Sequence, residues 1–134
     1  MGYRTSIIKT AGYLVLEAVI SLKKGDEEKI RAVMKELSER RTEKQPLDYP
    51  SAGSTFKRPE GYFAGKLIMD SGLRGYRAGG AQVSEKHCGF VINAGGATAE
   101  DVRSLMDHVI RVVREKYGVT LEPEVKFLGD FNGR

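Results

Sequence analysis

The sequence predicts an α+β fold for a chain of 134 residues, the size of one ordinary globular domain. Three segments carry apolar side chains at the spacing of a helix, whereas three others are rich in strand-forming residues. These segments do not follow the regular β-α-β order of a parallel sheet that is covered by helices. We therefore expect helices and strands that are packed together without that rhythm.

The first two expected elements are a strand and a helix. Apolar residues alternate between Tyr13 and Leu22, which is the two-residue period of a strand, and Gly25 interrupts the pattern. Acidic residues at 26–28 then stand where the positive end of a helix favours them, and the charged segment Glu39–Lys44 follows on an exposed side. The expected apolar stripe of this helix comprises Ile30, Val33, Met34 and Leu37.

The middle of the chain is rich in proline and glycine. Gln45–Pro59 contains three of the four prolines, so we expect an extended loop and an internal boundary there. Tyr62–Ser71 has the pattern of a short helix that ends before Gly72. We expect a turn or crossover at Leu73–Ala81 and a strand at Phe90–Ile92. The inward residues of the short helix would be Ala64, Leu67 and Ile68.

The longest expected helix begins at Thr98 and ends before Gly118. Asp101 stands three residues after Thr98, which is the spacing of a capping box. Val119–Leu128 is again rich in strand-forming residues, and Pro123 marks an expected edge or bend within it. The core stripe of the helix would comprise Val102, Leu105, Met106, Val109, Val113 and Tyr117.

Composition disfavours several classes of function. The net charge is +4, but Lys and Arg are interleaved with Asp and Glu, whereas a nucleic-acid-binding protein needs a clustered basic face. No apolar run approaches the roughly 18 residues of a membrane span. Two histidines and one cysteine, Cys88, are too few for a zinc site. Cys88 cannot form an internal disulfide, so we expect a cytoplasmic protein. From the charge pattern, the short apolar runs and the few metal-binding residues we expect no binding of nucleic acid, membranes or a metal.

The segment Tyr49–Pro59, YPSAGSTFKRP, is the strongest candidate for a site. A Gly-Ser pair allows a tight turn that exposes the hydroxyl of Ser54. Lys57 and Arg58 follow closely and suit a phosphate or carboxylate. An ordinary surface turn with solvated charges explains the same residues, and the segment alone does not decide between the two readings.

Other titratable residues also allow two interpretations. His87 precedes an apolar strand and either points into a cleft or has a structural role, whereas His108 has the pattern of a solvated helix residue. Cys88 is expected to be a small buried hydrophobe. Glu122 and Glu124 flank Pro123 on one side of an extended segment, where one of them could be half-buried and protonated or both could be exposed.

Four stretches of the chain resemble the UDP-N-acetylenolpyruvoylglucosamine reductase (MurB) family, in order and over nearly the whole length. AGSTFKRP and LEPEV at their observed separation are the most specific of these motifs. The four stretches are GYRTSIIK at 2–9, RRTEKQPLDYPSAGSTFKRPEGYFAGKLI at 40–68, LRGYRAGGAQVSEKHCGFVIN at 73–93 and GVTLEPEVKFLG at 118–129.

This resemblance implies a flavoenzyme of peptidoglycan synthesis. In such enzymes NADPH reduces FAD, and the flavin then reduces the double bond of UDP-N-acetylglucosamine enolpyruvate to give UDP-N-acetylmuramate. Ser54 matches the serine that protonates the substrate carbon. Arg4 and Glu124 match the arginine and glutamate that hold the substrate carboxylate and stabilise the enol-like intermediate.

The resemblance also implies a substrate-binding set and a fold. Lys44, Arg58, Arg74 and His87 align with positions that contact the UDP-sugar, where cationic side chains suit a diphosphate. The implied fold is a small antiparallel sheet packed with helices, together with a strand and a helix that would belong to the FAD-binding domain.

Members of the family are longer than this chain, and the part that would precede GYRTS supplies most of the FAD-binding surface. We therefore expect residues 1–44 to end the FAD-binding domain, 45–120 to form the substrate-binding domain and 121–134 to return toward the FAD lobe. The chain would be a carboxy-terminal part that does not retain FAD alone. A flavin-free UDP-sugar-binding module or an inactive truncated fragment is the alternative. Self-association through the strand at 13–22 is a further expectation.

Overall fold

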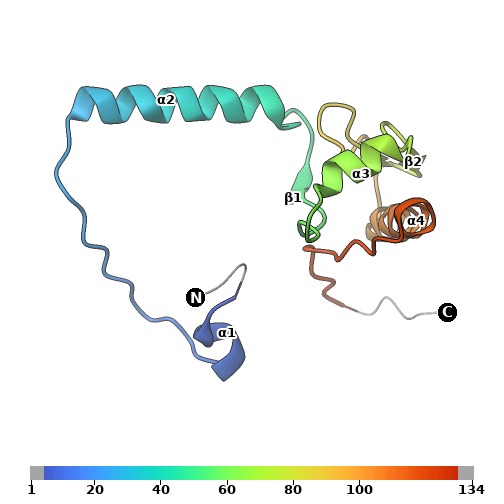
Figure 1. Cartoon of the computed structure of the whole chain (residues 1–134), viewed down its shortest axis with the longest axis horizontal. Helices are drawn as coiled ribbons and strands as arrows, with labels where there is room; N and C mark the ends of the chain where they lie inside the picture. The colour runs from blue at the N-terminus through green and yellow to red at the C-terminus, as the bar shows by residue number, and fades with distance from the viewer. Residues whose placement is uncertain (1–4, 130–134) are drawn as a thin grey trace. The chain divides into compact units, whose positions relative to one another are not determined.

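The computed structural model describes residues 5–129, and the chain divides into two units, Met1–Met34 and Lys35–Arg134. In the first unit a short helix, α1 (Ile7–Ala11), is followed by residues that form neither helix nor strand up to the start of α2 (Glu27–Lys44). Figure 1 shows this order along the chain. The sequence did not predict α1, which spans only five residues.

The predicted strand at Tyr13–Leu22 is wrong for this structure, because these residues make no strand pairing. Their alternating apolar side chains are exposed to solvent, with Leu14 at 83% and Leu16 at 90%. Alternating apolar side chains fit a strand with one buried face, but a strand also needs a neighbouring strand that pairs with its N–H and C=O groups. None of the described residues supplies that neighbour.

Helix α2 begins where the acidic residues predict. The side chain of Asp26 accepts a hydrogen bond from the backbone N–H of Lys29 at 3.1 Å, which satisfies one of the free donors of the first turn. The predicted apolar stripe is present but exposed, since its four residues keep between 48% and 65% of their surface in solvent. The helix therefore contributes no buried residue to the described core.

The second unit contains an antiparallel sheet of four strands in the order β1-β4-β3-β2. Strands β2 and β3 form a hairpin whose two-residue turn is Gly79-Gly80, and neither strand was predicted. Strand β1 was not predicted either, because it lies within the segment Gln45–Pro59 that was expected to be an extended loop. The predicted strand at Phe90–Ile92 is confirmed as β4. The strand bounds are β1 (Ser51–Ser54), β2 (Arg77–Ala78), β3 (Ala81–Val83) and β4 (Phe90–Asn93).

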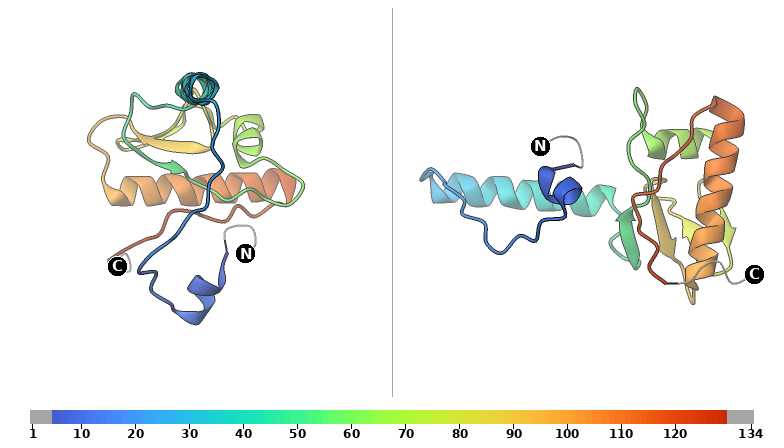
Figure 2. Two further views of the ribbon diagram at one scale, coloured as in Figure 1. Left: turned by 90° about the vertical axis from the view of Figure 1, so that its left-hand side faces the viewer. Right: turned by 90° about the horizontal axis from the view of Figure 1, so that it is seen from below.

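Two helices enclose the core together with this sheet. Helix α4 (Ala99–Tyr117) packs against β2 and β3, and α3 (Ala64–Asp70) packs on α4, so the sheet lies along one side of α4 in Figure 2. The inward residues predicted for α3 are buried as expected. The central core residues are Phe56, Leu67, Ile68, Val83, Val91, Leu105, Met106, Val109, Val113 and Leu121.

Helix α4 begins and ends at the residues expected from the sequence. Thr98 and Asp101 form a capping box, in which each side chain accepts a hydrogen bond from the other residue's backbone N–H. Gly118 ends the helix in the left-handed conformation, with φ of 68°. Of the predicted stripe, Val102 is partly buried and Tyr117 is exposed, since 40% of the Tyr117 surface remains in solvent at the last turn.

The tail after Gly118 forms less regular structure than its composition predicts. Residues 119–129 contain no strand, and Phe56 and Pro123 make a single antiparallel bridge. Pro123 lacks an N–H and cannot extend a ladder by donating, which keeps the pairing short. None of the helices in the described part of the chain is long and apolar enough to cross a membrane.

Candidate functional site

A β-bulge at the end of β1 presents Ser54. The register between β1 and β4 moves from Ser51 opposite Ile92 to Ser54 opposite Phe90, so β1 carries one residue more than its partner. Gly53 lies in this bulge with φ of 86°, a conformation that glycine adopts without strain. The Ser54 side chain is exposed and is aimed by a backbone feature that regular strand pairing would not produce.

The tail brings Glu124 alongside the same segment. The N–H of Lys57 donates to the carbonyl oxygen of Glu122 at 2.8 Å, and the N–H of Glu124 donates to the carbonyl oxygen of Thr55 at 2.9 Å. These two bonds flank the Phe56–Pro123 bridge, so Glu124 pairs with the residue next to Ser54. Glu124 is half-buried, whereas Glu122 is exposed and forms an ion pair with Lys57.

Contacts with its neighbours fix the orientation of the His87 ring. Its Nδ1 accepts a hydrogen bond from the backbone N–H of Gly89 at 3.1 Å, so the ring proton of the neutral imidazole is on Nε2. The ring meets Phe90 edge-on at 5.1 Å. A Cβ at Gly65 would lie 3.3 Å from the His87 ring, so the lack of a side chain at Gly65 leaves room for the imidazole. The buried hydroxyl of Ser84 fixes the preceding turn by accepting the His87 N–H at 3.2 Å.

Arg58 and Arg74 are exposed cations with different supports. The guanidinium of Arg58 lies 4.1 Å above the ring of Phe63, and its Nε donates to the carbonyl oxygen of Tyr62 at 3.3 Å. These contacts limit the freedom of the side chain and leave its other N–H groups available. The guanidinium of Arg74 contacts the sulfur of Met69 at 3.2 Å.

Lys44 is the last residue of α2 and is exposed. The same turn of α2 is tied to the segment that carries His87, because Nζ of Lys86 donates to the carbonyl oxygen of Thr42 at 2.8 Å. Within residues 5–129 no hydrogen bond or ion pair joins Lys44 or Arg74 to Ser54. Arg4 lies outside the described residues.

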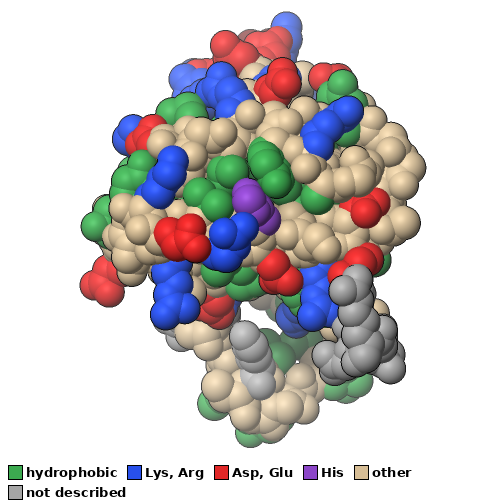
Figure 3. Space-filling model, turned by 90° about the vertical axis from the view of Figure 1, so that its right-hand side faces the viewer, with side chains coloured by type: hydrophobic (Ala, Val, Ile, Leu, Met, Phe, Trp, Pro, Cys, Tyr) green, Lys and Arg blue, Asp and Glu red, His purple; other side chains and the backbone are tan. Residues whose placement is uncertain are grey.

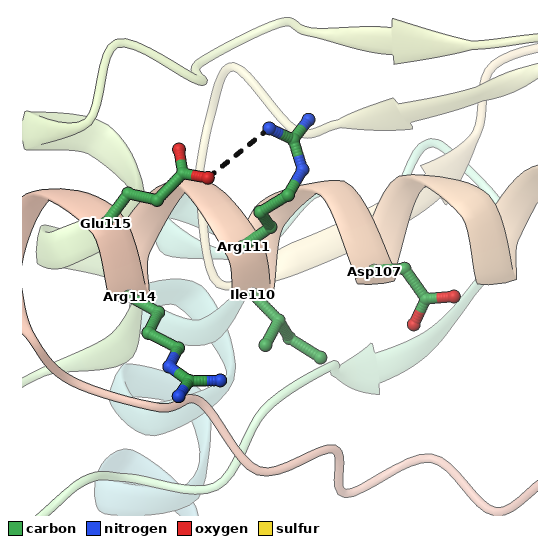
Figure 4. Close-up of a pocket in the computed structure, with 5 residues that line it drawn as sticks. All are labelled: Asp107, Ile110, Arg111, Arg114 and Glu115. Atoms are coloured by element: carbon green, nitrogen blue, oxygen red, sulfur yellow. Dashed lines mark ion pairs between the residues drawn. The ribbon is translucent and has the colours of Figure 1, made fainter.

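Two of the pockets lined by described residues are of interest here, and Ser54 does not line either of them. The smaller, of about 370 Å³, is lined mainly by short and apolar side chains: Pro50, Ser51, Ala52, Thr55, Val91, Asn93, Val102 and Val125. Figure 4 shows the larger, of about 500 Å³, whose lining side chains all project from α4: Asp107, Ile110, Arg111, Arg114 and Glu115. Arg111 pairs with Glu115 at 3.6 Å, so the charges of this shallow surface largely neutralise each other.

The N-terminus of α4 is occupied by the side chains of its own capping box. A pyrophosphate is commonly bound by free N–H groups at a helix N-terminus. At the start of α4 the Asp101 carboxylate already accepts from the N–H groups of Thr98 and Gly80, at 2.9 and 3.3 Å. Between residues 5 and 129 there is also no group of three metal-binding side chains. Figure 3 shows basic and acidic side chains interspersed over one face, with no extended patch of one sign.

Comparison with known proteins assigns the chain to a family. The family model for the C-terminal domain of UDP-N-acetylenolpyruvoylglucosamine reductase, MurB, matches residues 45–128. The chain belongs to the MurB family. The resemblance seen in the sequence is therefore confirmed.

Curated MurB relatives match almost the whole chain. The enzyme of Lachnoclostridium phytofermentans is 65% identical over 130 residues, which cover 97% of this chain and 42% of the relative. The enzyme of Agathobacter rectalis is 60% identical over 131 residues, which cover 98% of this chain and again 42% of the relative. The chain thus spans less than half the length of these relatives.

A solved MurB structure confirms the fold. The crystal structure of the reductase from Thermus caldophilus is 40% identical, with a TM-score of 0.65, and the match covers 79% of this chain and 37% of that one. The α+β class and the small antiparallel sheet are as predicted.

Of the predicted MurB site residues, the described contacts bring Ser54, Glu124 and His87 into one connected region. Sequence reasoning missed Thr55, which is 2% exposed and contacts all three segments. A β-branched hydroxyl residue directly after a Gly-Ser bulge was the available signal. Lys57, which suggested an anion-binding role, pairs with Glu122 instead.

Proposed function

We propose that this chain supplies the substrate-binding and proton-donating part of a reductase that converts UDP-N-acetylglucosamine enolpyruvate to UDP-N-acetylmuramate. Membership of the MurB family supports the reaction class. The observation that carries the proposal is the pairing of the tail with the segment after the bulge, which holds Glu124 next to the neighbour of Ser54.

The two residues fit complementary steps. When the enolpyruvyl double bond is reduced, electron density collects on the carbon beside the carboxylate. We assign Ser54 Oγ as the donor of a proton to that carbon. The half-buried Glu124 would stabilise the charge that develops there, together with Arg4. A hydroxyl is a weak acid, so Ser54 needs this preorganised environment to act at neutral pH.

Binding of the UDP-sugar would rest on the second set of residues. Arg58, held over Phe63, can donate two parallel N–H bonds to a phosphate without losing much side-chain freedom. His87 would donate through Nε2, because its Nδ1 is already occupied by Gly89. Lys44 and Arg74 are exposed cations that would complete the diphosphate contacts.

The flavin is expected to bind outside these residues. FAD and NADPH are the cofactors that the family resemblance implies, and the same resemblance implies that most of the FAD-binding surface precedes the residues matched here. We therefore expect the 134-residue chain alone to purify without stoichiometric flavin. The proposed division is that 1–44 ends a flavin-binding domain, 45–120 binds substrate and 121–134 returns toward the flavin lobe.

A flavin-free UDP-sugar-binding module is the second candidate. The observation in its favour is that Arg58 and His87 are positioned by contacts within the chain itself. Such a module would bind the same substrate without turning it over. A cytoplasmic location remains our prediction, based on the single buried Cys88.

A chimera separates these functions. The residues of the Lachnoclostridium phytofermentans enzyme that match this chain would be replaced by it, and NADPH oxidation measured with UDP-N-acetylglucosamine enolpyruvate. We expect turnover, and we expect Ser54→Ala to reduce kcat by at least about 100-fold. An inactive, folded chimera that still binds substrate by calorimetry would support the module, and absence of both binding and turnover would contradict both candidates.

Self-association is a separate proposal. The apolar side chains of residues 13–22 are exposed, and unpaired apolar segments tend to associate with another chain. We expect sedimentation of the isolated chain to show dimers or larger species that dissociate in a Leu14→Ser, Leu16→Ser variant. A monomeric mass at high concentration would contradict this.

A further inference from the structure

Thr55 lies at the junction of the segments that carry the proposed site residues. Its N–H donates to the carbonyl oxygen of Gly89 at 2.9 Å, and its carbonyl oxygen accepts from Glu124 N–H at 2.9 Å. Its hydroxyl Oγ1 accepts from the N–H of Val91, also at 2.9 Å. One buried residue thus binds the turn before β4, the strand β4 and the tail.

The hydroxyl bond compensates for the bulge. In a regular antiparallel pair the N–H groups of one strand are accepted by carbonyl oxygens of the other. The extra residue in β1 disrupts that ladder between Ser51 and Ser54, and the N–H of Val91 is bonded by a side chain. A buried N–H without an acceptor is costly, so the hydroxyl favours the register in which the bulge exists.

The same residue connects His87 to Ser54. Gly89 donates its N–H to Nδ1 of His87 and accepts the N–H of Thr55 through its carbonyl oxygen. Ser54 immediately precedes Thr55. A shift of Thr55 would therefore displace the hydroxyl of Ser54, the backbone of Glu124 and the support of the His87 ring together.

We propose that Thr55 is a positioning residue whose Oγ1–Val91 hydrogen bond holds Ser54 in register with Glu124 and His87. The inference rests on the proposed function of Ser54 and Glu124. Thr55 itself is 2% exposed, so it acts through these residues and not on the substrate. Misplacement of a reacting group by about 1 Å can cost about 100-fold in rate, so a small change in register is enough to reduce turnover.

Two isosteric substitutions in the active chimera test this role. Thr55→Val removes only the buried acceptor of the Val91 N–H, and Thr98→Val removes the solvent-exposed acceptor of the Asp101 N–H at the start of α4. We expect both variants to lower the Tm. Only Thr55→Val should also lower kcat, by about tenfold to 100-fold, with a smaller change in KM. Thr55→Ser keeps the hydroxyl and should restore most of kcat.

Equal kcat for Thr55→Val and Thr98→Val, or no rescue by Thr55→Ser, would overturn the inference while leaving the proposed function intact. An inactive unsubstituted chimera would contradict the proposed function alone. Hydrogen–deuterium exchange on the 134-residue chain tests the hydrogen bonds of Thr55 without any variant. We expect slow exchange at the amides of Val91 and Glu124, and rapid exchange at either would overturn the inference.

Discussion

The backbone N–H of Glu124 donates to the carbonyl oxygen of Thr55 at 2.9 Å, across 69 residues of sequence. A tail that forms no strand of its own is thereby attached to the bulged end of β1. Because the bond is made by the backbone, the position of Glu124 depends on the conformation of the bulge. Changes to the bulge should therefore affect the proposed chemistry at both residues.

Gly53→Ala is expected to impair the site more than the fold. The φ of 86° at Gly53 is unfavourable for alanine by roughly 1–2 kcal/mol, although a Cβ there would meet no atom within 4 Å. Strain can be relieved by straightening the bulge, which would move Ser54. In the chimera we expect a modest loss of stability with a large loss of kcat.

Gly118→Ala is the matched control for this substitution. Gly118 has φ of 68°, also with open space around its added Cβ, and it ends α4. Gly118→Ala should lower the free energy of unfolding by about as much as Gly53→Ala and leave kcat nearly unchanged. Equal losses of kcat in the two variants would show that stability alone explains the effect of Gly53→Ala.

The ion pair between Lys57 and Glu122 should contribute little to holding the tail. Both side chains are partly solvated, at 32% and 68% exposure, and such pairs are worth about 0–1 kcal/mol. A double-mutant cycle with Lys57→Met and Glu122→Gln measures the coupling directly. We expect a coupling below about 1 kcal/mol that falls with added salt, and slow exchange of the Glu124 amide in both variants. A larger coupling would mean that side-chain contacts, and not backbone hydrogen bonds, hold the tail in place.

The parts of the fold that could be predicted from sequence are those fixed by local interactions. Helix α4 is specified by Thr98, Asp101 and Gly118, each of which acts within one turn of the helix. The strand expected at 13–22 depends on hydrogen bonds from a partner that its own residues do not encode, and it failed for that reason. Strands β2 and β3 are too short for a period of two to be visible.

The residues of the proposed site come from family resemblance, and their connections could not be predicted from sequence. AGSTFKRP and LEPEV suggested Ser54 and Glu124 as site residues, whereas the local pattern also allowed an ordinary surface turn and exposed carboxylates. The role of Thr55 follows from a one-residue difference in strand register, which is a long-range property. The backbone pairing of Lys57 with Glu122 likewise depends on how the tail returns.

Asp101 should make stability depend on acidic pH. The backbone N–H groups of Thr98 and Gly80 hold the pKa of its carboxyl below the ordinary value of an aspartate, with a further contribution from the Thr98 side chain. Because the pKa of Asp101 is lower in the folded state than the unfolded value of about 3.9, its carboxylate stabilises the fold fully at pH values above the unfolded pKa. This stabilisation is lost as pH falls through the folded pKa.

Asp101→Asn tests that linkage. Urea unfolding at several pH values should show a variant that is less stable than the parent at neutral pH, with the difference shrinking as pH falls below about 4. Asp107→Asn removes an exposed carboxylate of the same helix and should leave neutral stability nearly unchanged. A difference between Asp101→Asn and the parent that stays constant with pH would contradict the linkage.

His108 should titrate below the usual range of histidine. Its ring stacks on Tyr76 with centroids 4.3 Å apart, and the guanidinium of Arg111 lies 2.9 Å from Nδ1. Burial lowers the pKa of His108, the charge of Arg111 lowers it further, and Glu115 partly opposes both.

The folded state therefore favours the neutral imidazole. The resulting stability is present above the unfolded pKa of about 6.5 and is lost as pH falls through the lower folded value. NMR titration of the His108 ring protons should give a midpoint below about 6.5, and Tyr76→Ala should raise it by exposing the ring. A midpoint at or above that of an unfolded chain, or no change in Tyr76→Ala, would mean that the stack does not shield His108 from solvent.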